Sequence, residues 1–295
     1  MNILVTGANG QLGNSIRRLS ADCGHRFIFT DVSSPEGVET VFLDITDKQT
    51  VSLVLQAEDV DMIINCAAYT NVDKAETDEG FAYSLNCIAP RNLAEAAKEH
   101  GCSLIHISTD YVFDGCGCTP ILPDADPSPR SAYGRTKLAG ERAVAESGCP
   151  YVIIRTAWLY SEYGKNFLKT MLNLTNVNDN VKVVYDQVGS PTYAGDLAAA
   201  VLRIVQVWDR KESVICHFTD QGAVSWYDFA SEINSLAGHR CKVNACLSAE
   251  FPSKVDRPHY SVLDKTSIAE KFGVVVPNWK ESLVKCLNNM KNGIQ

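Results

Sequence analysis

The chain is predicted to fold as an α/β protein with a doubly wound parallel sheet, and three observations carry that prediction. Short apolar runs rich in Val, Ile, Leu and Phe alternate with helical patterns. A glycine-rich turn follows the first apolar run at Gly7, Gly10 and Gly13. Near the middle, Tyr133 and Lys137 stand four residues apart in a helical pattern. Near-continuous apolar runs suit buried parallel strands, and β-α-β alternation implies right-handed crossovers around one sheet.

The elements follow from the order of these patterns. The strands of the sheet are expected at 2–6, 26–29, 38–43, 61–65, 104–108 and 151–155. The helices between them are expected at 11–21, 48–56, 80–100 and 132–146. After residue 155 the alternation is less regular, with helices expected at 166–174, 194–207, 226–236 and 279–290 and strands at 181–184, 214–218 and 242–246.

Size and composition are those of a globular chain. It has 295 residues, of which 45% are hydrophobic and 21% charged. The net charge of -8 argues against a broad nucleic-acid-binding face. No apolar run approaches the ~18 residues of a membrane span, and the first residues form a strand rather than an export signal. We therefore expect a cytoplasmic protein that binds neither nucleic acid nor membrane. Its eleven cysteines, an odd count, are expected to be free thiols.

The glycine-rich turn predicts a dinucleotide site. Gly7 permits a tight turn, Gly10 lets the backbone approach a pyrophosphate, and Gly13 lets the helix pack closely on the strand. The amides at the start of that helix then face the phosphates. The candidate cofactor contacts of this turn are Gly7, Asn9, Gly10, Gln11, Leu12 and Gly13.

Asp31 ends the second strand, where a carboxylate can accept hydrogen bonds from the adenosine ribose. Its charge would disfavour the 2′-phosphate of NADP, although Arg17 and Arg18 on the first helix could partly compensate. The cofactor is therefore expected to be NADPH or NADH, with the preference open.

Tyr133 and Lys137 predict the chemistry. At four-residue spacing both side chains lie on one helical face, where the lysine charge can lower the pKa of the phenol. A second apolar run, 103–111, ends in the hydroxyls of Ser108 and Thr109 at a strand end, where doubly wound sheets place their ligands. These features together predict a nicotinamide-dependent reductase with Tyr133 as the proton donor.

With its Gly-x-x-Gly-x-x-Gly spacing and Tyr-x-x-x-Lys pair, the chain resembles the extended branch of the short-chain dehydrogenase/reductase superfamily. The resemblance implies that Lys137 also holds the nicotinamide ribose and that Thr109, or Ser108 beside it, binds the substrate oxygen. It implies that Asn86 supports the catalytic lysine through water. The remaining cofactor contacts implied are Asp44 and Ile45 at the adenine and Cys66, Ala67, Ala68 and Tyr69 beneath the cofactor.

Longer sequence segments point to one family within this superfamily. The segments 108–115, 133–141 and 155–160, followed by 164–171, 186–192 and 257–264, resemble the signatures of the dTDP-4-dehydrorhamnose reductase family in family order. Members reduce the 4-keto group of a dTDP-6-deoxy-L-hexulose to give dTDP-L-rhamnose, a precursor of cell-surface polysaccharide. The resemblance and the chemistry of the side chains give these candidate substrate contacts: Thr109, Asp110, Val112, Trp158, Lys165, Asn166 and Arg257.

The chain length and the looser alternation after residue 155 suggest two lobes. Residues 1–160 are expected to form a Rossmann-like dinucleotide-binding domain to which 186–216 return, while 161–185 and 217–295 form a smaller α/β lobe for the nucleotide sugar. Some relatives dimerise through a Mg²⁺ site built from late glutamates, but the corresponding stretch here, 272–279, has no carboxylates. We therefore expect no such metal site, and a monomer or a weak homodimer.

Three alternatives stay open. Another extended-branch nucleotide-sugar reductase or epimerase would keep the same motifs. A dehydratase is poorly supported, because dehydratases of this branch usually carry Asp-Glu after the threonine and this chain has Asp110-Tyr111. A non-catalytic subunit with the same fold, like the relative that regulates methionine adenosyltransferase, is disfavoured by the intact Thr109, Tyr133 and Lys137.

Overall fold

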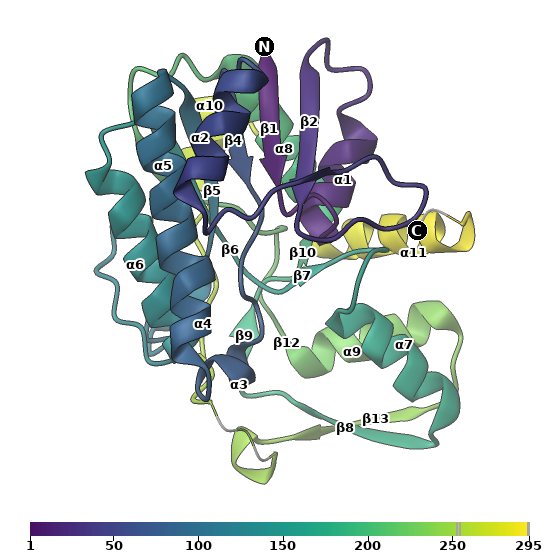
Figure 1. Cartoon of the computed structure of the whole chain (residues 1–295). Coiled ribbons are helices and arrows are strands. Elements are labelled where there is room, and N and C mark those ends of the chain that lie inside the picture. The colour runs from purple at the N-terminus through teal and green to yellow at the C-terminus, as the bar shows by residue number, and fades with distance from the viewer. Residues whose placement is uncertain (252, 254, 294–295) are drawn as a thin grey trace.

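A seven-stranded parallel sheet forms the centre of the fold (Figure 1). The computed structural model describes residues 1–251, 253 and 255–293. The strands lie in the order β11-β6-β5-β4-β1-β2-β3, and the order reverses between β1 and β4. This arrangement confirms the predicted doubly wound sheet. The bounds are β1 Asn2–Thr6, β2 Arg26–Asp31, β3 Val41–Phe42, β4 Met62–Asn65, β5 Ser103–Thr109, β6 Tyr151–Thr156 and β11 Val214–His217.

Helices cover both faces of the sheet because successive strand residues point to opposite sides. Ile3 and Val5 of β1 pack in one core cluster, and Leu4 between them packs in the other. The first cluster lies under α1 (Gln11–Leu19) and α8 (Ala194–Val207), which pack on each other. The second lies under three helices: α2 Lys48–Ala57, α5 Ala89–His100 and α6 Ala132–Glu146.

Two predicted elements differ from the structure. The helix expected over 80–100 is divided into α4 (Glu79–Tyr83), a π-helical turn (Ser84–Ile88) and α5. Pro90 stands at the start of α5, where its missing N–H costs least. The strand expected over 38–43 is only the two-residue β3, an edge strand whose Val41 and Phe42 are exposed. An edge position buries too little of these side chains to extend the pairing.

A smaller lobe lies beyond the carboxyl ends of the strands (Figure 1). Three two-stranded sheets pair β7 with β10, β8 with β13 and β9 with β12. Their bounds are β7 Leu159–Tyr160, β8 Asn180–Val184, β9 Val188–Gly189, β10 Thr192–Tyr193, β12 Val224–Ser225 and β13 Lys242–Cys246. Its helices are α7 Phe167–Val177, α9 Trp226–Ala237 and α11 Trp279–Lys291; the remaining short elements are α3 Val72–Ala75, η2 Asp110–Val112, η3 Ser248–Glu250 and α10 Thr266–Phe272.

The position of α10 differs from the predicted lobe boundary. Ile268 and Phe272 of this helix pack in the core cluster of the large sheet, beside α8 and β11. The sequence prediction places all of 217–295 in the smaller lobe. Here the chain crosses back to the sheet before α11 returns to the small lobe, where Leu283 packs with Phe229 of α9.

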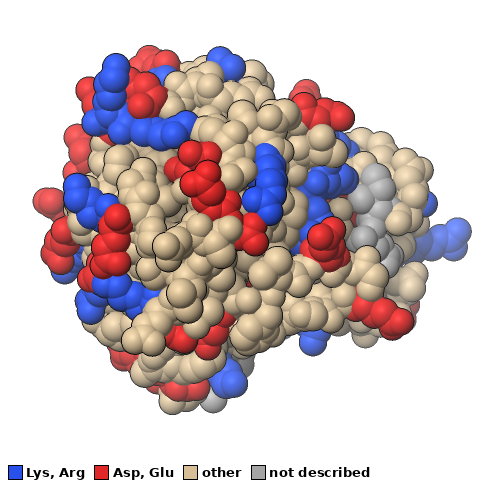
Figure 2. All heavy atoms as spheres, turned by 45° about the horizontal axis from the view of Figure 1, so that its top comes forward, with Lys and Arg blue, Asp and Glu red and all other residues tan. Residues whose placement is uncertain are grey.

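Charged side chains of both signs lie on the face of the molecule that Figure 2 draws. Figure 2 shows acidic and basic side chains interspersed on one face of the molecule rather than gathered by sign. Within the described part of the chain, every helix is too short or too polar to cross a lipid bilayer. All eleven cysteines are unpaired.

Two buried polar networks tie the elements together. Arg155 on β6 donates from Nε and Nη2 to the carboxylate of Glu141 on α6, at 3.0 and 2.7 Å, and from Nη1 to the carbonyl of Pro123 at 3.0 Å. Each side chain of this ion pair is only 3% exposed. The hydroxyl of Ser108 donates to the same carboxylate. This network fixes α6 over the ends of β5 and β6.

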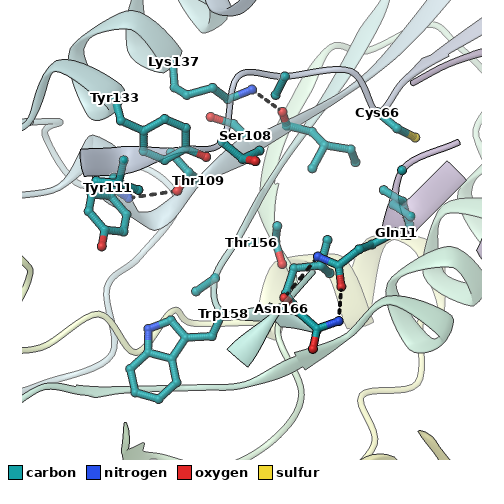
Figure 3. A pocket seen from close by; sticks show the side chains of 18 of the residues that line it. Gln11, Cys66, Ser108, Thr109, Tyr111, Tyr133, Lys137, Thr156, Trp158 and Asn166 are labelled. Atoms are coloured by element: carbon teal, nitrogen blue, oxygen red, sulfur yellow. Dashed lines mark hydrogen bonds between the residues drawn. The ribbon is translucent and has the colours of Figure 1, made fainter. Parts of the chain in front are cut away.

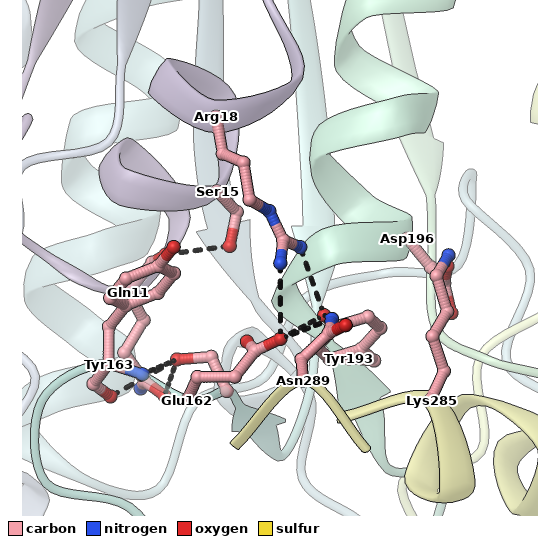
Figure 4. A network of polar contacts seen from close by, with 10 residues as sticks. Gln11, Ser15, Arg18, Glu162, Tyr163, Tyr193, Asp196, Lys285 and Asn289 are labelled. Carbon is pink, nitrogen blue, oxygen red and sulfur yellow. Dashed lines mark hydrogen bonds and ion pairs between the residues drawn. The ribbon is translucent and has the colours of Figure 1, made fainter. Parts of the chain in front are cut away.

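The second network joins α1 to the small lobe (Figure 4). Glu162 is fully buried and accepts from Arg18 at 3.4 Å, from the Tyr193 hydroxyl at 2.5 Å and from Asn289 of α11 at 2.6 Å. Arg18 also donates to the Tyr193 hydroxyl at 3.1 Å. A charge that is out of water needs such partners, so this cluster holds the two lobes in one orientation.

Replacing Arg155 with Met should lower the free energy of unfolding by about 3–5 kcal/mol, because Glu141 would be left charged and buried without its partner. The matched control is Arg26→Met, which breaks an ion pair to Glu58 whose arginine side chain is 58% exposed. That control should cost less than about 1 kcal/mol. Urea unfolding followed by circular dichroism measures both; equal losses would show that the buried pair contributes no more than a surface pair.

Candidate active site

A cavity of about 530 Å³ opens at the carboxyl ends of β1, β4, β5 and β6 (Figure 3). This is where the strand order reverses and where doubly wound sheets bind their ligands. The cavity wall brings together these sequence-predicted residues: Gly7, Gly10, Gln11, Leu12, Cys66, Ala68, Thr109, Asp110, Tyr133, Lys137, Trp158, Lys165 and Asn166.

Several predicted site residues do not line this cavity, and several residues that were not predicted do. The candidates that do not form the wall of this cavity are Asn9, Gly13, Asp31, Asp44, Ile45, Ala67, Tyr69, Asn86, Val112 and Arg257. The wall includes several residues that were not predicted: Thr70, Val72, Ile107, Tyr111, Thr156, Ala157, Leu159 and Gly164. Each of these lies next to or within a motif used for the prediction, so extending each motif by a few residues would have found them.

The glycine-rich turn has the shape that a dinucleotide requires. Gly7 has φ of +63°, and a Cβ there would lie 2.6 Å from the amide nitrogen of Ala67. A Cβ on Gly13 would lie 2.5 Å from Cα of Ala8. The N-cap of α1, Gly10, has no capping side chain, so the first helical amides are available to an anion. The turn therefore fits a pyrophosphate.

Asp31 lies at the expected place but is already hydrogen-bonded. Its carboxylate accepts from the Asn9 amide at 3.1 Å and from the amide and hydroxyl of Ser33 at 3.0 and 2.8 Å. Arg17 lies with its guanidinium 4.1 Å from the ring centroid of Phe29 and donates to the carbonyl of Glu39. Arg18 is turned away to Glu162, so of the two arginines only Arg17 lies near the ribose end.

The residues expected at the adenine form a turn before α2. Asp44 accepts from the amide and hydroxyl of Thr46 at 2.9 and 2.7 Å. The side chain of Asn92 donates to the carbonyls of Ile45 and Thr46. These contacts hold the turn rigidly and bury Ile45.

Asn86 makes contacts that the sequence did not predict, and its expected support of Lys137 through water stays a prediction. Its side chain accepts from the Tyr69 amide at 2.9 Å and donates to the Tyr69 carbonyl and the Thr136 hydroxyl, both at 3.1 Å. Because the π-helical turn directs the amide toward residue 69, Asn86 holds the segment that follows β4.

Helix α6 carries Tyr133 and Lys137 into the cavity. Ser131 caps the helix by accepting from the amide of Gly134 at 3.0 Å. The helix lies so close to its neighbours that a Cβ on Gly134 would be 2.2 Å from the Tyr111 carbonyl oxygen, and one on Gly140 would be 2.0 Å from that of Asn86. Lys137 Nζ donates to the Ile107 carbonyl at 2.6 Å. Figure 3 shows the Tyr133 hydroxyl directed toward Thr109.

The acidity of the phenol differs from the prediction. Burial raises the pKa of Tyr133, and the hydrogen bond with Thr109 opposes that rise only in part. The expected lowering by Lys137 is not seen, because the amine lies against the backbone of β5. Burial also lowers the pKa of Lys137 to about 8. A phenol with a raised pKa stays protonated, which a proton donor requires.

Asp110 and Val112 follow Thr109 in η2. The Asp110 carboxylate accepts from the Thr109 hydroxyl at 3.0 Å, and burial raises the pKa of Asp110 to about 6. Val112 is fully buried and packs with Phe113, Leu138 and Leu263. The side chain of Val112 is therefore part of the core, and its contact with the substrate stays a prediction.

The far wall of the cavity belongs to the small lobe. Trp158 has φ of +50°, a strained conformation for a non-glycine residue, and stacks on Trp226 with ring centroids 3.5 Å apart. The glycine at 189 makes room for this ring, since a Cβ there would lie 2.7 Å from it. Asn166 caps α7 and donates to Gln11 Oε1 at 3.0 Å. The glycine-rich turn and the small lobe thus meet at Gln11.

Arg257 does not line the cavity itself, but it interacts with the side chain of Tyr111, which does. It pairs with Asp73 of α3 at 2.7 Å, and its side chain is 31% exposed. This ion pair links the small lobe to the segment after β4. The predicted phosphate contact would require Arg257 to exchange this partner.

Known proteins are similar to this chain along nearly its whole length. The family model described as RmlD substrate binding domain matches residues 1–292. A dTDP-4-dehydrorhamnose reductase of Aggregatibacter actinomycetemcomitans is 39% identical, covering 95% of this chain and 96% of that protein.

Two solved structures are similar to this chain in both fold and sequence. A crystal structure of a dTDP-4-dehydrorhamnose reductase from Clostridium acetobutylicum ATCC 824 is 43% identical, with a TM-score of 0.91 over 99% of this chain and 100% of that one. A second, from Bacillus anthracis str. Ames in complex with NADP, is 34% identical, with a TM-score of 0.88 over 98% and 99% of the two chains. This chain belongs to the dTDP-4-dehydrorhamnose reductase family.

Proposed function

We propose that this protein reduces the 4-keto group of dTDP-4-dehydro-L-rhamnose with NADPH or NADH and releases dTDP-L-rhamnose for cell-surface polysaccharide synthesis. The observation that carries the proposal is that Tyr133, Lys137 and Thr109 line the same cavity as the glycine-rich turn. Relatives named for this activity match nearly the whole chain. The residues of the cavity support the reaction type, and the names of the relatives support the identity of the sugar substrate.

The cofactor would lie between the turn and the catalytic pair. Gly7, Gly10 and the start of α1 would hold the pyrophosphate, Asp31 the adenosine ribose, and Lys137 the nicotinamide ribose. When bound, the dihydronicotinamide supplies the hydride that reaches the carbonyl carbon of the sugar. Asp44, Ile45 and the segment from Cys66 to Tyr69 complete the proposed cofactor contacts.

The chain supplies the proton and the charge stabilisation. The Tyr133 hydroxyl gives its proton to the carbonyl oxygen as hydride arrives at carbon, so the product leaves as an alcohol rather than an alkoxide. The Thr109 hydroxyl, which donates to Asp110 in the structure, could turn its single proton to the same oxygen and stabilise the developing charge. Lys137, charged below a pH of about 8, would favour the tyrosinate that remains, although burial dominates the pKa of Tyr133 in the structure.

The small lobe would hold the nucleotide sugar. Trp158 offers a flat apolar face already braced by Trp226, which suits a sugar or a thymine ring. Lys165 and Asn166 lie in the same wall and can reach polar groups of the sugar diphosphate. Asp110, beside Thr109, can accept from a sugar hydroxyl. Arg257 would meet the diphosphate if it left Asp73, since a guanidinium binds phosphate in two places at once.

We also propose that the protein works in the cytoplasm, as a monomer or a weak homodimer. The support for the second part is that 272–279 lacks the carboxylates of the metal-linked dimer of some relatives. The activity itself is tested by mixing the protein with dTDP-4-dehydro-L-rhamnose and NADPH or NADH. Cofactor absorbance should fall and dTDP-L-rhamnose should form; no turnover with either cofactor would reject the proposal.

Tyr133→Phe should lower turnover by at least ~10²-fold and leave cofactor affinity nearly unchanged, because the substitution removes the proton donor and keeps the ring. Steady-state kinetics and fluorescence titration with NADPH measure the two effects. Tyr160→Phe is the matched control: this buried tyrosine of the small lobe has a hydroxyl with no partner among the described residues. Near-normal turnover in Tyr133→Phe would remove this residue from the proposed role.

Asp31→Ala should weaken NADH binding more than NADPH binding, because the variant loses a ribose acceptor and also a charge that repels the 2′-phosphate. The dissociation constants of both cofactors measure the effect, with exposed Asp22→Ala as the control for a lost carboxylate. An equal loss for both cofactors would reject the contact between Asp31 and the ribose.

A further inference from the structure

A row of buried side chains runs from β1 through β4 and β5 to Lys137. The Thr6 hydroxyl donates to Asn65 Oδ1 at 2.7 Å, Asn65 Nδ2 lies 3.0 Å from His106 Nδ1, and His106 Nε2 lies 3.5 Å from Lys137 Nζ. All four side chains are at most 1% exposed. The proposed reaction uses only the last of them.

The backbone fixes which way the Asn65 amide points. The amide nitrogen of Ala67 lies 3.1 Å from Asn65 Oδ1, and a backbone N–H can only donate. The atom facing Ala67 and Thr6 must therefore be the oxygen. The NH₂ group of Asn65 is left facing His106 Nδ1.

This orientation dictates the tautomer of His106. An NH₂ group is a donor, so His106 Nδ1 must accept and cannot carry a proton. Burial, together with the charge of Lys137, holds the pKa of His106 well below its usual range, so the ring stays neutral. Its single proton is then on Nε2, and that N–H is the group that faces Lys137.

An imidazole N–H toward an amine discriminates between the two protonation states of Lys137. An ammonium group has only donors and is opposed by another donor, whereas a neutral amine has a lone pair that can accept. The other groups around this amine have mixed effects, since Glu141 favours the charged form and is itself paired with Arg155. Among the titratable groups, His106 lies 3.5 Å from the amine and Glu141 acts on its charge, while Tyr133, Asp110 and Cys66 line the same cavity.

We propose that Asn65 locks His106 in the Nε2–H tautomer, and that His106 thereby acts as a positioning residue that makes Lys137 lose its proton at a lower pH than it otherwise would. The inference rests on the proposed function for its catalytic consequence, because Lys137 acts on Tyr133 in its charged form. Its structural content concerns only the placement of one proton. That part can be tested without turnover.

The first experiment locates the proton in the full-length protein. Long-range ¹H–¹⁵N spectra of protein labelled with [¹⁵N]histidine distinguish a protonated from a bare ring nitrogen. Six histidines are present, and the His106 signals are those lost in His106→Phe. We expect a protonated Nε2 and a bare Nδ1 at every pH at which the protein is folded. A proton on Nδ1 would overturn the proposal whether or not the protein reduces a sugar.

The second experiment reverses the tautomer. In Asn65→Asp one carboxylate oxygen can still accept from Ala67 and Thr6, while the other accepts from His106 Nδ1–H and leaves a bare Nε2 facing Lys137. The pKa of Lys137, read from its ¹³Cε signal, should then rise by about one unit. The basic limb of the kcat/KM profile should move to higher pH by the same amount. An unmoved pKa with a lower kcat would indicate a merely structural role and would contradict the proposal.

A double-mutant cycle separates the ring from the direct effect of the new carboxylate. In a His106→Phe background no ring nitrogen can transmit the change, so Asn65→Asp should move the pKa of Lys137 by less than half as much as in the parent protein. A shift of the same size in both backgrounds would overturn the proposal. His217→Phe is the matched control, since this second fully buried histidine has no partner for its ring nitrogens among the described residues and should leave both the His106 signals and the pH profile unchanged.

Discussion

The structure depends on the close packing of α6 across the ends of β5 and β6. Tyr133, Lys137 and Glu141 are spaced four residues apart, so they form one stripe on the inner face of the helix. Glu141 pairs with Arg155 inside the protein, Lys137 reaches the β5 backbone, and Tyr133 enters the cavity. Glycines at 134 and 140 let the helix approach this closely. The ion pair that fixes the helix therefore also sets the position of the phenol.

Burial then determines the acid–base properties of the site. Out of water, the pKa of Tyr133 rises and that of Lys137 falls to about 8, so the phenol holds its proton and the lysine lies close to its titration near neutral pH. The small lobe adds a second wall through Trp158 and Asn166, and Gln11 joins that wall to the glycine-rich turn. Because the Glu162 cluster holds the lobes together, the glycine-rich turn and Trp158 line one cavity.

Most of the fold and the centre of the site could be predicted from the sequence, because both follow local patterns. The strand of 242–246 and the helices of 132–146 and 194–207 begin and end where their apolar spacing predicts. The contacts that the sequence did not predict arise where tertiary packing decides. Asn86 turns toward residue 69 because of a π-helical turn, Arg257 is captured by Asp73 from a distant segment, and α10 rejoins the large sheet. The raised pKa of Tyr133 also depends on burial, which no spacing of residues reveals.

The central claim is that Tyr133 donates a proton to the carbonyl oxygen of a sugar that packs against Trp158. A crystal structure with an oxidised dinucleotide and dTDP-L-rhamnose tests it most directly. The account predicts the Tyr133 hydroxyl within about 2.6–3.2 Å of the sugar O4, with Thr109 also in contact with that oxygen. A sugar bound with O4 directed away from Tyr133, or outside the wall formed by Trp158, would contradict the account.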